Sequence, residues 1–260
     1  MVDAQGSGRF AGRRVLVVGG GTGIGWAVAQ RVAREGAEVV VADLPTGAGP
    51  SAQAVPAGLA GQGHVAATVD VTDRRSVDAL LAALDRLDVL VHVAGGDRAH
   101  PAFADTDDEA WTALLELNLL GFVRTSRAAA PLLLASEHGP AVVVVGSVNA
   151  VLALGSEPYS AAKAGLVSLV ANLAVDLAPR VRVNAVLPAT IRTRVWDDQP
   201  GAAEAMRSLY PLDRVGTPDD VAGAVAFLAS DDAAWVTGHA LPVDGGLLTG
   251  GSLRRLVGDG

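Results

Sequence analysis

The chain has 260 residues, of which 50% are hydrophobic and 18% charged, a composition that excludes disorder as the state of the whole chain. A net charge of −8 argues against a nucleic-acid partner, because phosphate recognition requires a basic surface. The absence of cysteine excludes disulfides, cysteine-ligated zinc and a thiol nucleophile, and no apolar run reaches the roughly 18 residues that span a membrane. We therefore expect a cytoplasmic protein with no membrane segment.

Short runs rich in valine alternate with longer Ala/Leu-rich stretches of helical period. Because the runs are almost wholly apolar, they are typical of strands buried on both faces of a parallel sheet. The predicted strands are Val15–Val18, Val39–Ala42, Val65–Val69, Val89–Val93, Val142–Val145, Val181–Val186 and Leu241–Val243. The predicted helices are Ile24–Glu35, Arg74–Leu84, Asp107–Ala135, Pro158–Leu177 and Asp219–Leu228. This alternation predicts an α/β Rossmann fold, a doubly wound seven-stranded parallel sheet with helices on both faces.

Two segments interrupt the alternation. Residues 44–63 are rich in Pro, Gly, Ala and Ser and predict a loop or a poorly formed helix. Residues 190–214 form a long insertion near the carboxyl end of the sheet, a common place for a substrate lid. With no linker or internal repeat, residues 1–260 are expected to form one domain.

The first predicted strand runs directly into a glycine-rich turn, residues 19–25 (GGGTGIG), and a helix follows. Glycines at such a turn allow close approach of a pyrophosphate, whose charge is stabilised by amides at the start of the helix. A flexible turn is the alternative. The position of the turn between a strand and a helix favours a dinucleotide site.

An acidic residue, Asp43, ends the second predicted strand, 18 residues after the glycine turn. A carboxylate there can bind both hydroxyls of an adenosine ribose and would repel a 2′-phosphate. Residues 36–73 contain no Lys or Arg, so only Arg13, Arg14 or Arg74 could pair with such a phosphate. The sequence therefore favours NAD over NADP, and a solvated loop acid is the alternative.

The 20 basic residues include a single lysine, Lys163, four residues after one of only two tyrosines, Tyr159. The spacing places both side chains on one face of the predicted helix. A nearby ammonium favours the phenolate, so we expect the pKa of Tyr159 to be lowered from about 10 toward working pH, which would give a general acid/base. An incidental Tyr and Lys on a helix is the alternative.

Two further polar residues strengthen this interpretation. Ser147 follows the apolar run 141–146, so its hydroxyl is expected at the carboxyl edge of the sheet, beside the cofactor crevice. Asn118 lies in the apolar stretch 114–120, and its buried amide requires helical carbonyls or a water as partners.

Taken together, these motifs resemble the short-chain dehydrogenase/reductase family over nearly the whole chain, 12–246. The family's T-G-x-x-x-G-x-G falls on residues 18–25, its N-N-A-G on 92–95, and its N-x-V-x-P-G on 184–189. The closing motifs match at 211–214 and 243–246. The resemblance implies a catalytic tetrad of Asn118, Ser147, Tyr159 and Lys163. The residues that it implies for cofactor binding are Gly19, Gly21, Thr22, Gly23, Ile24, Gly25, Asp43, Asp70, Val71, Val93, Ala94, Gly95, Tyr159, Lys163, Pro188, Ile191 and Thr193.

The chain departs from the family pattern at four positions. Val18 replaces the motif threonine, His92 and Val93 replace both asparagines of N-N-A-G, and Ala189 replaces a glycine. None of these residues is the proton-transfer group. We therefore expect altered loop rigidity rather than lost chemistry.

The resemblance implies hydride transfer between NAD(H) and a secondary alcohol or ketone. Tyr159 would exchange the proton, Ser147 would bind the substrate oxygen, Lys163 would hold the nicotinamide ribose and lower the pKa of Tyr159, and Asn118 would support a water. One alternative is an NADPH-dependent ketoreductase for an acyl or polyketide substrate, with Arg13 or Arg14 at the 2′-phosphate. Another is a nucleotide-sensing protein without turnover.

The substrate is less evident from the sequence. Leu152, Leu154, Val195 and Trp196 suggest an apolar pocket wall. Asp97, Arg98 and His100 either face this pocket or are solvated, and Arg192 and Arg194 either bind a carboxylate or form salt bridges. The histidines lack metal-ligand spacing, so we infer no metal. The resemblance further implies a homotetramer, with a dimer as the alternative.

Overall fold

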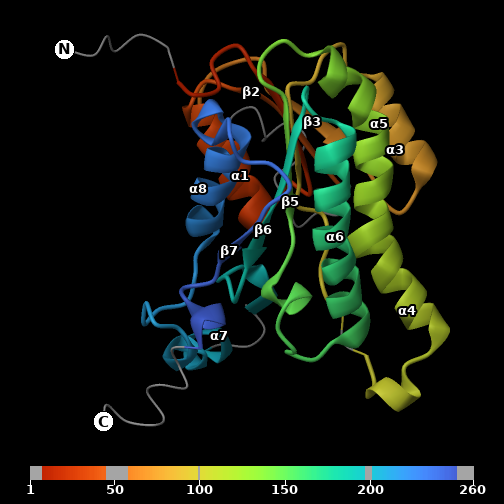
Figure 1. Cartoon of the computed structure of the whole chain (residues 1–260), viewed down its shortest axis with the longest axis vertical. Helices are drawn as coiled ribbons and strands as arrows, with labels where there is room; N and C mark the ends of the chain where they lie inside the picture. The colour runs from red at the N-terminus through yellow and green to blue at the C-terminus, as the bar shows by residue number, and fades with distance from the viewer. Residues whose placement is uncertain (1–7, 45–57, 99, 197–200, 251–260) are drawn as a thin grey trace.

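The computed structural model describes residues 8–44, 58–98, 100–196 and 201–250 (Figure 1). Seven parallel strands form one sheet in the order β3-β2-β1-β4-β5-β6-β7, which confirms the predicted doubly wound sheet. Strand order reverses between β1 and β4, and in open sheets of this kind ligands generally bind beyond the carboxyl ends of the strands at such a point. The strands are β1 (Arg14–Val18), β2 (Glu38–Asp43), β3 (Val65–Thr68), β4 (Val89–His92), β5 (Ala141–Val145), β6 (Arg182–Pro188) and β7 (Ala240–Val243).

Helices cover both faces of the sheet, with α1 and α8 on one side and α3, α5 and α6 on the other (Figure 1). Strand β1 shows why: Val15 and Val17 pack in the cluster that contains α1 and α8, whereas Leu16 and Val18 pack in the opposite cluster. An apolar side chain at every position therefore buries both faces of the strand. The helices are α1 (Gly23–Arg34), α3 (Arg74–Ala82), α4 (Asp108–Leu115), α5 (Gly121–Ala135), α6 (Glu157–Asp176), α7 (Ala202–Ala205) and α8 (Pro218–Ala229).

The helix predicted as one piece from Asp107 to Ala135 is interrupted. A π-helical turn, Glu116–Leu120, separates α4 from α5. Asn118 lies in this turn, and its Nδ2 donates to the carbonyl oxygen of Leu114 at 3.0 Å. The predicted helix is therefore present over almost the whole range, but the π turn within it was not predicted, because apolar periodicity does not register its extra residue. Such turns occur frequently at functional sites.

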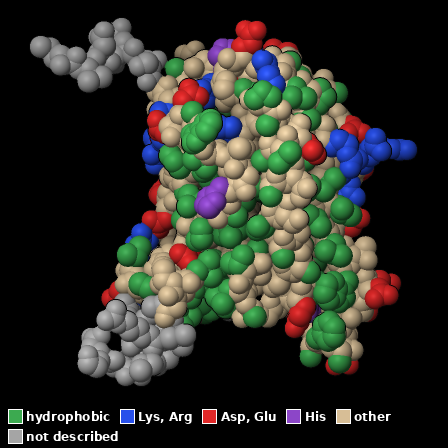
Figure 2. All heavy atoms as spheres, viewed as in Figure 1, with side chains coloured by type: hydrophobic (Ala, Val, Ile, Leu, Met, Phe, Trp, Pro, Cys, Tyr) green, Lys and Arg blue, Asp and Glu red, His purple; other side chains and the backbone are tan. Residues whose placement is uncertain are grey.

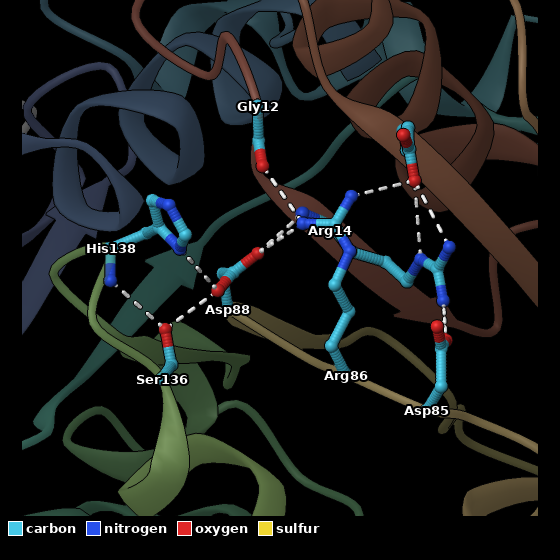
Figure 3. Close-up of polar contacts among 8 residues, drawn as sticks. Gly12, Arg14, Asp85, Arg86, Asp88, Ser136 and His138 are labelled. Carbon is cyan, nitrogen blue, oxygen red and sulfur yellow. Dashed lines mark hydrogen bonds and ion pairs between the residues drawn. The ribbon is translucent and has the colours of Figure 1, made fainter.

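A polar network closes the amino ends of the strands (Figure 3). Asp88, 2% exposed, accepts hydrogen bonds from the backbone nitrogen of Arg14 at 2.7 Å and from Oγ of Ser136 at 2.6 Å. The guanidinium of Arg86 lies 3.3 Å from the same carboxylate and 2.8 Å from Glu38, which also pairs with Arg14. The network therefore satisfies a buried charge at the edge of the sheet opposite the glycine turn.

The charged residues do not gather on the face drawn in Figure 2. Lys and Arg side chains are scattered there among Asp and Glu, around a band of hydrophobic side chains. Within the described ranges, no helix has both the length and the apolar character needed to cross a membrane.

Candidate active site

The glycine turn lies between β1 and α1 and packs closely against neighbouring backbone. Gly19 has φ +78°, and a Cβ built on it would lie 2.5 Å from the backbone nitrogen of Ala94. A Cβ on Gly25 would lie 2.0 Å from the carbonyl oxygen of Gly19. Only glycine fits at both positions. The first turn of α1 contains no acidic residue, so its amides are available to a pyrophosphate, and this end of the helix fits a dinucleotide.

Asp43 is joined directly to the glycine turn. Its Oδ2 accepts a hydrogen bond from the backbone nitrogen of Gly21 at 2.7 Å, and its Oδ1 accepts one from Leu44 at 2.8 Å. Each carboxylate oxygen has a second lone pair, which remains for a ribose hydroxyl. The structure thus brings the acid and the glycines together at the carboxyl ends of β1 and β2.

Arg13 and Arg14 are not near Asp43, contrary to what the NADPH alternative requires. Arg14 begins β1 and lies in the amino-end network of Figure 3, and Arg13 pairs with Asp231 at 2.6 Å. The glycine turn follows Val18 at the other end of the strand, four residue steps or roughly 13 Å away. Because both arginines are held in ion pairs at the amino end of β1, neither reaches a 2′-phosphate bound beside Asp43.

The segment after β6 returns to the glycine turn. A Cβ on Gly23 would lie 3.3 Å from Cγ2 of Thr193, so these two predicted cofactor positions are adjacent. Ile191 is 7% exposed and bridges to Gly216. Residues 197–200 of the predicted lid, and 45–57 of the predicted loop, lie outside the described residues. A cavity of about 250 Å³ opens beside Ile191 and Tyr210, away from Tyr159.

Tyr159 and Lys163 lie one turn apart on α6, as their spacing predicts. Nζ of Lys163 is 5.5 Å from the centroid of the Tyr159 ring. The same nitrogen donates a hydrogen bond to the carbonyl oxygen of Val145 at 3.0 Å, and the lysine is only 3% exposed. Ser147 follows β5 directly and is 8% exposed. Helix α6 and the end of β5 thus bring the three side chains together.

The pKa of Tyr159 is raised from its ordinary value, and the expectation that Lys163 lowers it was wrong for the chain alone. Burial of the phenol is the largest cause, the Ser147 hydroxyl lowers the value, and the Asp97 carboxylate raises it again. Lys163 does not reverse the effect of burial, because its ammonium is directed to Val145 and itself loses solvation. Burial lowers the pKa of Lys163 to about 8.

Asn118 links the π turn to the loop after β4. Its Nδ2 donates to the carbonyl oxygen of Gly96, and its Oδ1 accepts from the nitrogen of Gly96, both at 2.9 Å. A Cβ on Gly95 would lie 2.7 Å from Oδ1 of Asn118 and 3.3 Å from Nζ of Lys163. Asn118 and Lys163 therefore both border this loop, and Asn118 fixes its position through Gly96.

The remaining predicted cofactor residues are placed as follows. The Asp70 carboxylate accepts from the backbone and hydroxyl of Thr72, which lowers the pKa of Asp70, and Val71 is buried in the core. Val93 and Ala94 continue β4, and their backbone nitrogens donate to the carbonyl oxygen of Val18. Whether Asp70 and Val71 contact an adenine stays a prediction.

His92, one of the departures from the family pattern, is enclosed in the core. It is 1% exposed, and its ring packs edge-on against that of Phe122 with the ring centroids 5.4 Å apart. Neither ring nitrogen has a regular hydrogen-bond partner among the residues that the structure describes. Burial, followed by the charge of Lys163, lowers the pKa of His92 to about 3. The imidazole is therefore neutral in the folded protein.

His92→Asn is expected to make the protein more resistant to acid. Between pH 6.5 and 3 the unfolded state binds a proton that the folded state refuses, so stability falls as pH falls through this window. Between pH 8 and pH 5 this histidine should cost the wild type about 2 kcal/mol of unfolding free energy, a loss that His92→Asn lacks. Urea unfolding at both pH values measures it. His239→Asn, at an exposed position, is the control, and equal losses in wild type and His92→Asn would contradict the prediction.

Two hydrogen-bond partners of serines in this region, Asn149 and Asp97, were not predicted from the sequence. Asn149 accepts a hydrogen bond from Oγ of Ser147 at 3.1 Å and donates to Ser160 at 3.3 Å. Asp97 accepts a hydrogen bond from Oγ of Ser156 at 2.6 Å. The position of Asn149, two residues after Ser147, was a usable signal, whereas the contact between Asp97 and Ser156 joins residues far apart in the sequence.

The chain is similar to known proteins over most of its length. Residues 19–248 match the family model described as enoyl-(acyl carrier protein) reductase. The chain is 39% identical to cis-4-hydroxycyclohexanecarboxylate dehydrogenase of Sinomonas cyclohexanicum, over 91% of this chain and 97% of that protein. It is 36% identical to 3-oxoacyl-[acyl-carrier-protein] reductase FabG of Escherichia coli, over 92% and 98%. The ligand-free aldohexose dehydrogenase of Thermoplasma acidophilum superposes with a TM-score of 0.82 at 29% identity, over 97% and 98%.

Proposed function

Because the chain belongs to the short-chain dehydrogenase/reductase family, and is an oxidoreductase that uses a nicotinamide cofactor, we propose that it interconverts a secondary alcohol and a ketone with NAD(H). Tyr159 is the general acid/base in this proposal. The direction is oxidation of the alcohol, which two dehydrogenases among the similar proteins support by their names.

The observation that carries the proposal is the grouping of Ser147, Tyr159 and Lys163, with Lys163 next to Gly95 in the loop that packs against the glycine turn through Ala94. The phenol is the only acid/base of the three that is half-buried, while the ammonium is enclosed and bonded to Val145. A proton carrier open to substrate, supported by a cation shielded from it, suits proton exchange with a carbinol.

Each residue of the predicted tetrad has its own role in the proposed reaction. The nicotinamide, when bound, accepts or supplies the hydride. Ser147 exchanges its hydrogen bond to Asn149 for one to the substrate oxygen and so orients it. Tyr159 removes the hydroxyl proton during oxidation and returns it during reduction. Lys163 stabilises the phenolate and holds the ribose, and Asn118 fixes the adjacent loop through Gly96.

Asp43 supports NAD as the cofactor. Its carboxylate is fixed at the glycine turn by Gly21, where it would meet the hydroxyls of an adenosine ribose. Residues 36–73 carry no Lys or Arg that could neutralise a 2′-phosphate, and Arg13 and Arg14 lie at the opposite end of β1. A phosphorylated ribose would therefore bring two anionic groups together.

Asp43→Asn is expected to reduce the preference for NADH over NADPH by about 10-fold or more, because it removes the charge but keeps an acceptor for Gly21. Asp43→Ala should also reduce the preference for NADH, and it should lower the affinity for both cofactors, because the glycine turn loses its hydrogen bond to Asp43. Paired titrations that follow energy transfer from tryptophan measure both affinities. An unchanged ratio in both variants would place the discrimination elsewhere.

The second candidate is an NADPH-dependent ketoreductase. The match to a 3-oxoacyl-[acyl-carrier-protein] reductase favours it, at 36% identity over most of both chains. Tighter binding of NADPH than NADH by the wild type would put this candidate first. Failure to bind either would point to a defect at the altered positions Val18, His92 and Val93, or to a role without turnover.

We include a cytoplasmic homotetramer in the proposal. Trp235 is 100% exposed near the edge strand β7, and Val175 of α6 is 76% exposed, so apolar side chains are available for assembly. Light scattering of the purified protein distinguishes a tetramer from a dimer.

A further inference from the structure

The loop after β4 meets the start of α6 at the mouth of the candidate active site. Oγ of Ser156 donates to Oδ1 of Asp97 at 2.6 Å, and the backbone nitrogen of Arg98 donates to the same oxygen at 2.9 Å. Nε2 of His100 lies 3.1 Å from Oγ of Ser156. Asp97 is thus fixed by a residue three positions before Tyr159 on the chain.

Ser156 adopts a conformation that favours this contact over ordinary helix capping. Its φ is +51°, in the left-handed region that side chains seldom occupy, and it makes no side-chain capping bond to α6. The hydroxyl is instead directed to the loop after β4. The bond to Asp97 therefore offsets a strained backbone and fixes the position of the carboxylate.

The second carboxylate oxygen of Asp97, Oδ2, has no hydrogen-bond or ion-pair partner among the residues that the structure describes. Asp97 is an exposed residue. The charge is nevertheless felt at the reacting phenol, since the carboxylate raises the pKa of Tyr159. An anion held by Ser156 thus lies close enough to the phenol to act on it, with its second oxygen free of partners among the described residues.

We propose that Asp97 is a specificity-determining residue, whose carboxylate accepts a hydrogen bond from a second hydroxyl of a neutral, polyhydroxylated substrate and disfavours substrates with a carboxylate there. The inference rests on the proposed function and names its substrate class. A hydroxyl donor satisfies Oδ2, whereas a substrate anion is repelled by Asp97 and gains no partner from it.

Three cyclohexanols that differ only at C4 test the proposal: 4-(hydroxymethyl)cyclohexanol, 4-methylcyclohexanol and 4-hydroxycyclohexanecarboxylate, all of one ring configuration. With NAD, kcat/KM of the wild type should fall in that order. Asp97→Asn should raise kcat/KM for the carboxylate about 10-fold relative to the methyl compound, because repulsion is removed. Asp97→Ala, which lacks the acceptor, should abolish the advantage of the hydroxymethyl compound over the methyl compound.

Glu157→Gln is the matched control, because it removes the same charge from an exposed position in the first turn of α6. Its three ratios should equal those of the wild type. The acid limb of kcat/KM should also move to lower pH in Asp97→Asn and not in Glu157→Gln. The titratable and polar groups that face the phenol are Ser147, Lys163 and Asp97. His92 lies close to Lys163, and His100 contacts Ser156.

Turnover of all three alcohols with ratios that neither Asp97 variant changes would overturn the inference and leave the proposed function intact. If no alcohol is oxidised, the proposed function fails, and calorimetric binding to the NAD-treated protein decides the inference separately. Tighter binding of the hydroxymethyl compound than of the carboxylate, lost in Asp97→Ala, supports it. Equal binding, or none, overturns it.

Discussion

Tyr159→Phe is expected to lower kcat/KM for alcohol oxidation by about 10³-fold, because the variant lacks the hydroxyl that exchanges the proton with substrate. Cofactor affinity should stay within about twofold of the wild type, since the ring that packs near Lys163 is retained. Steady-state rates, together with NADH titration, measure the two effects separately. A loss of turnover without a loss of binding assigns the hydroxyl to the chemical step.

The chain offers a matched control for this substitution. Tyr210 is the other tyrosine, and within the described ranges its hydroxyl accepts a single hydrogen bond, from the backbone nitrogen of Thr190 at 3.3 Å. Tyr210→Phe removes the same atom and should keep kcat/KM within about fivefold of wild type. Near-normal activity of Tyr159→Phe would remove Tyr159 from the acid/base role.

Lys163→Arg is expected to lower turnover by about 100-fold or more, although it conserves charge. The ammonium is enclosed, 3% exposed, and bonded to Val145, so the larger planar guanidinium has no room to keep this position. NADH affinity of the wild type should weaken as pH rises through about 8, where Lys163 loses its proton, whereas the arginine stays charged. Pre-steady-state rates and NADH titrations from pH 7 to 9.5 measure both effects.

A second variant separates chemistry from folding. Lys163→Met has a similar length and removes the charge without burying a new polar group, so thermal unfolding should remain cooperative while turnover is lost. Arg74→Lys, at an exposed position on α3, controls for a basic exchange in itself. Wild-type turnover in Lys163→Arg would contradict the special role given to the only lysine.

Some elements of the candidate site could be predicted from short stretches of sequence. The glycine turn, Asp43 and the pair Tyr159 and Lys163 each depend on spacing within one strand, turn or helix. A parallel α/β sheet carries the carboxyl ends of its strands to one edge, so Ser147 was expected there as well. These predictions needed only local pattern and a general rule of topology.

The pKa of Tyr159 could not be predicted in the same way. Spacing on α6 places Lys163 near the phenol, but it does not tell that the ammonium donates to Val145 on β5. The spacing also gives no information on the burial of the phenol or on the effect of Asp97, both of which raise its pKa. The sign of the shift depends on groups from three separate elements, and burial outweighs the rest.

The sequence by itself determined the architecture, because apolar runs of strand length and Ala/Leu-rich helices can bury their surfaces in few arrangements. It also determined the residue types available for chemistry, including one lysine and an acid after the glycine turn. Only the tertiary structure decided their partners: the π turn at Asn118, the amino-end position of Arg14, and the bond from Ser156 to Asp97. The physical reason is that periodicity reflects burial of a segment, whereas a hydrogen bond or a pKa reflects whichever distant segment packs beside it.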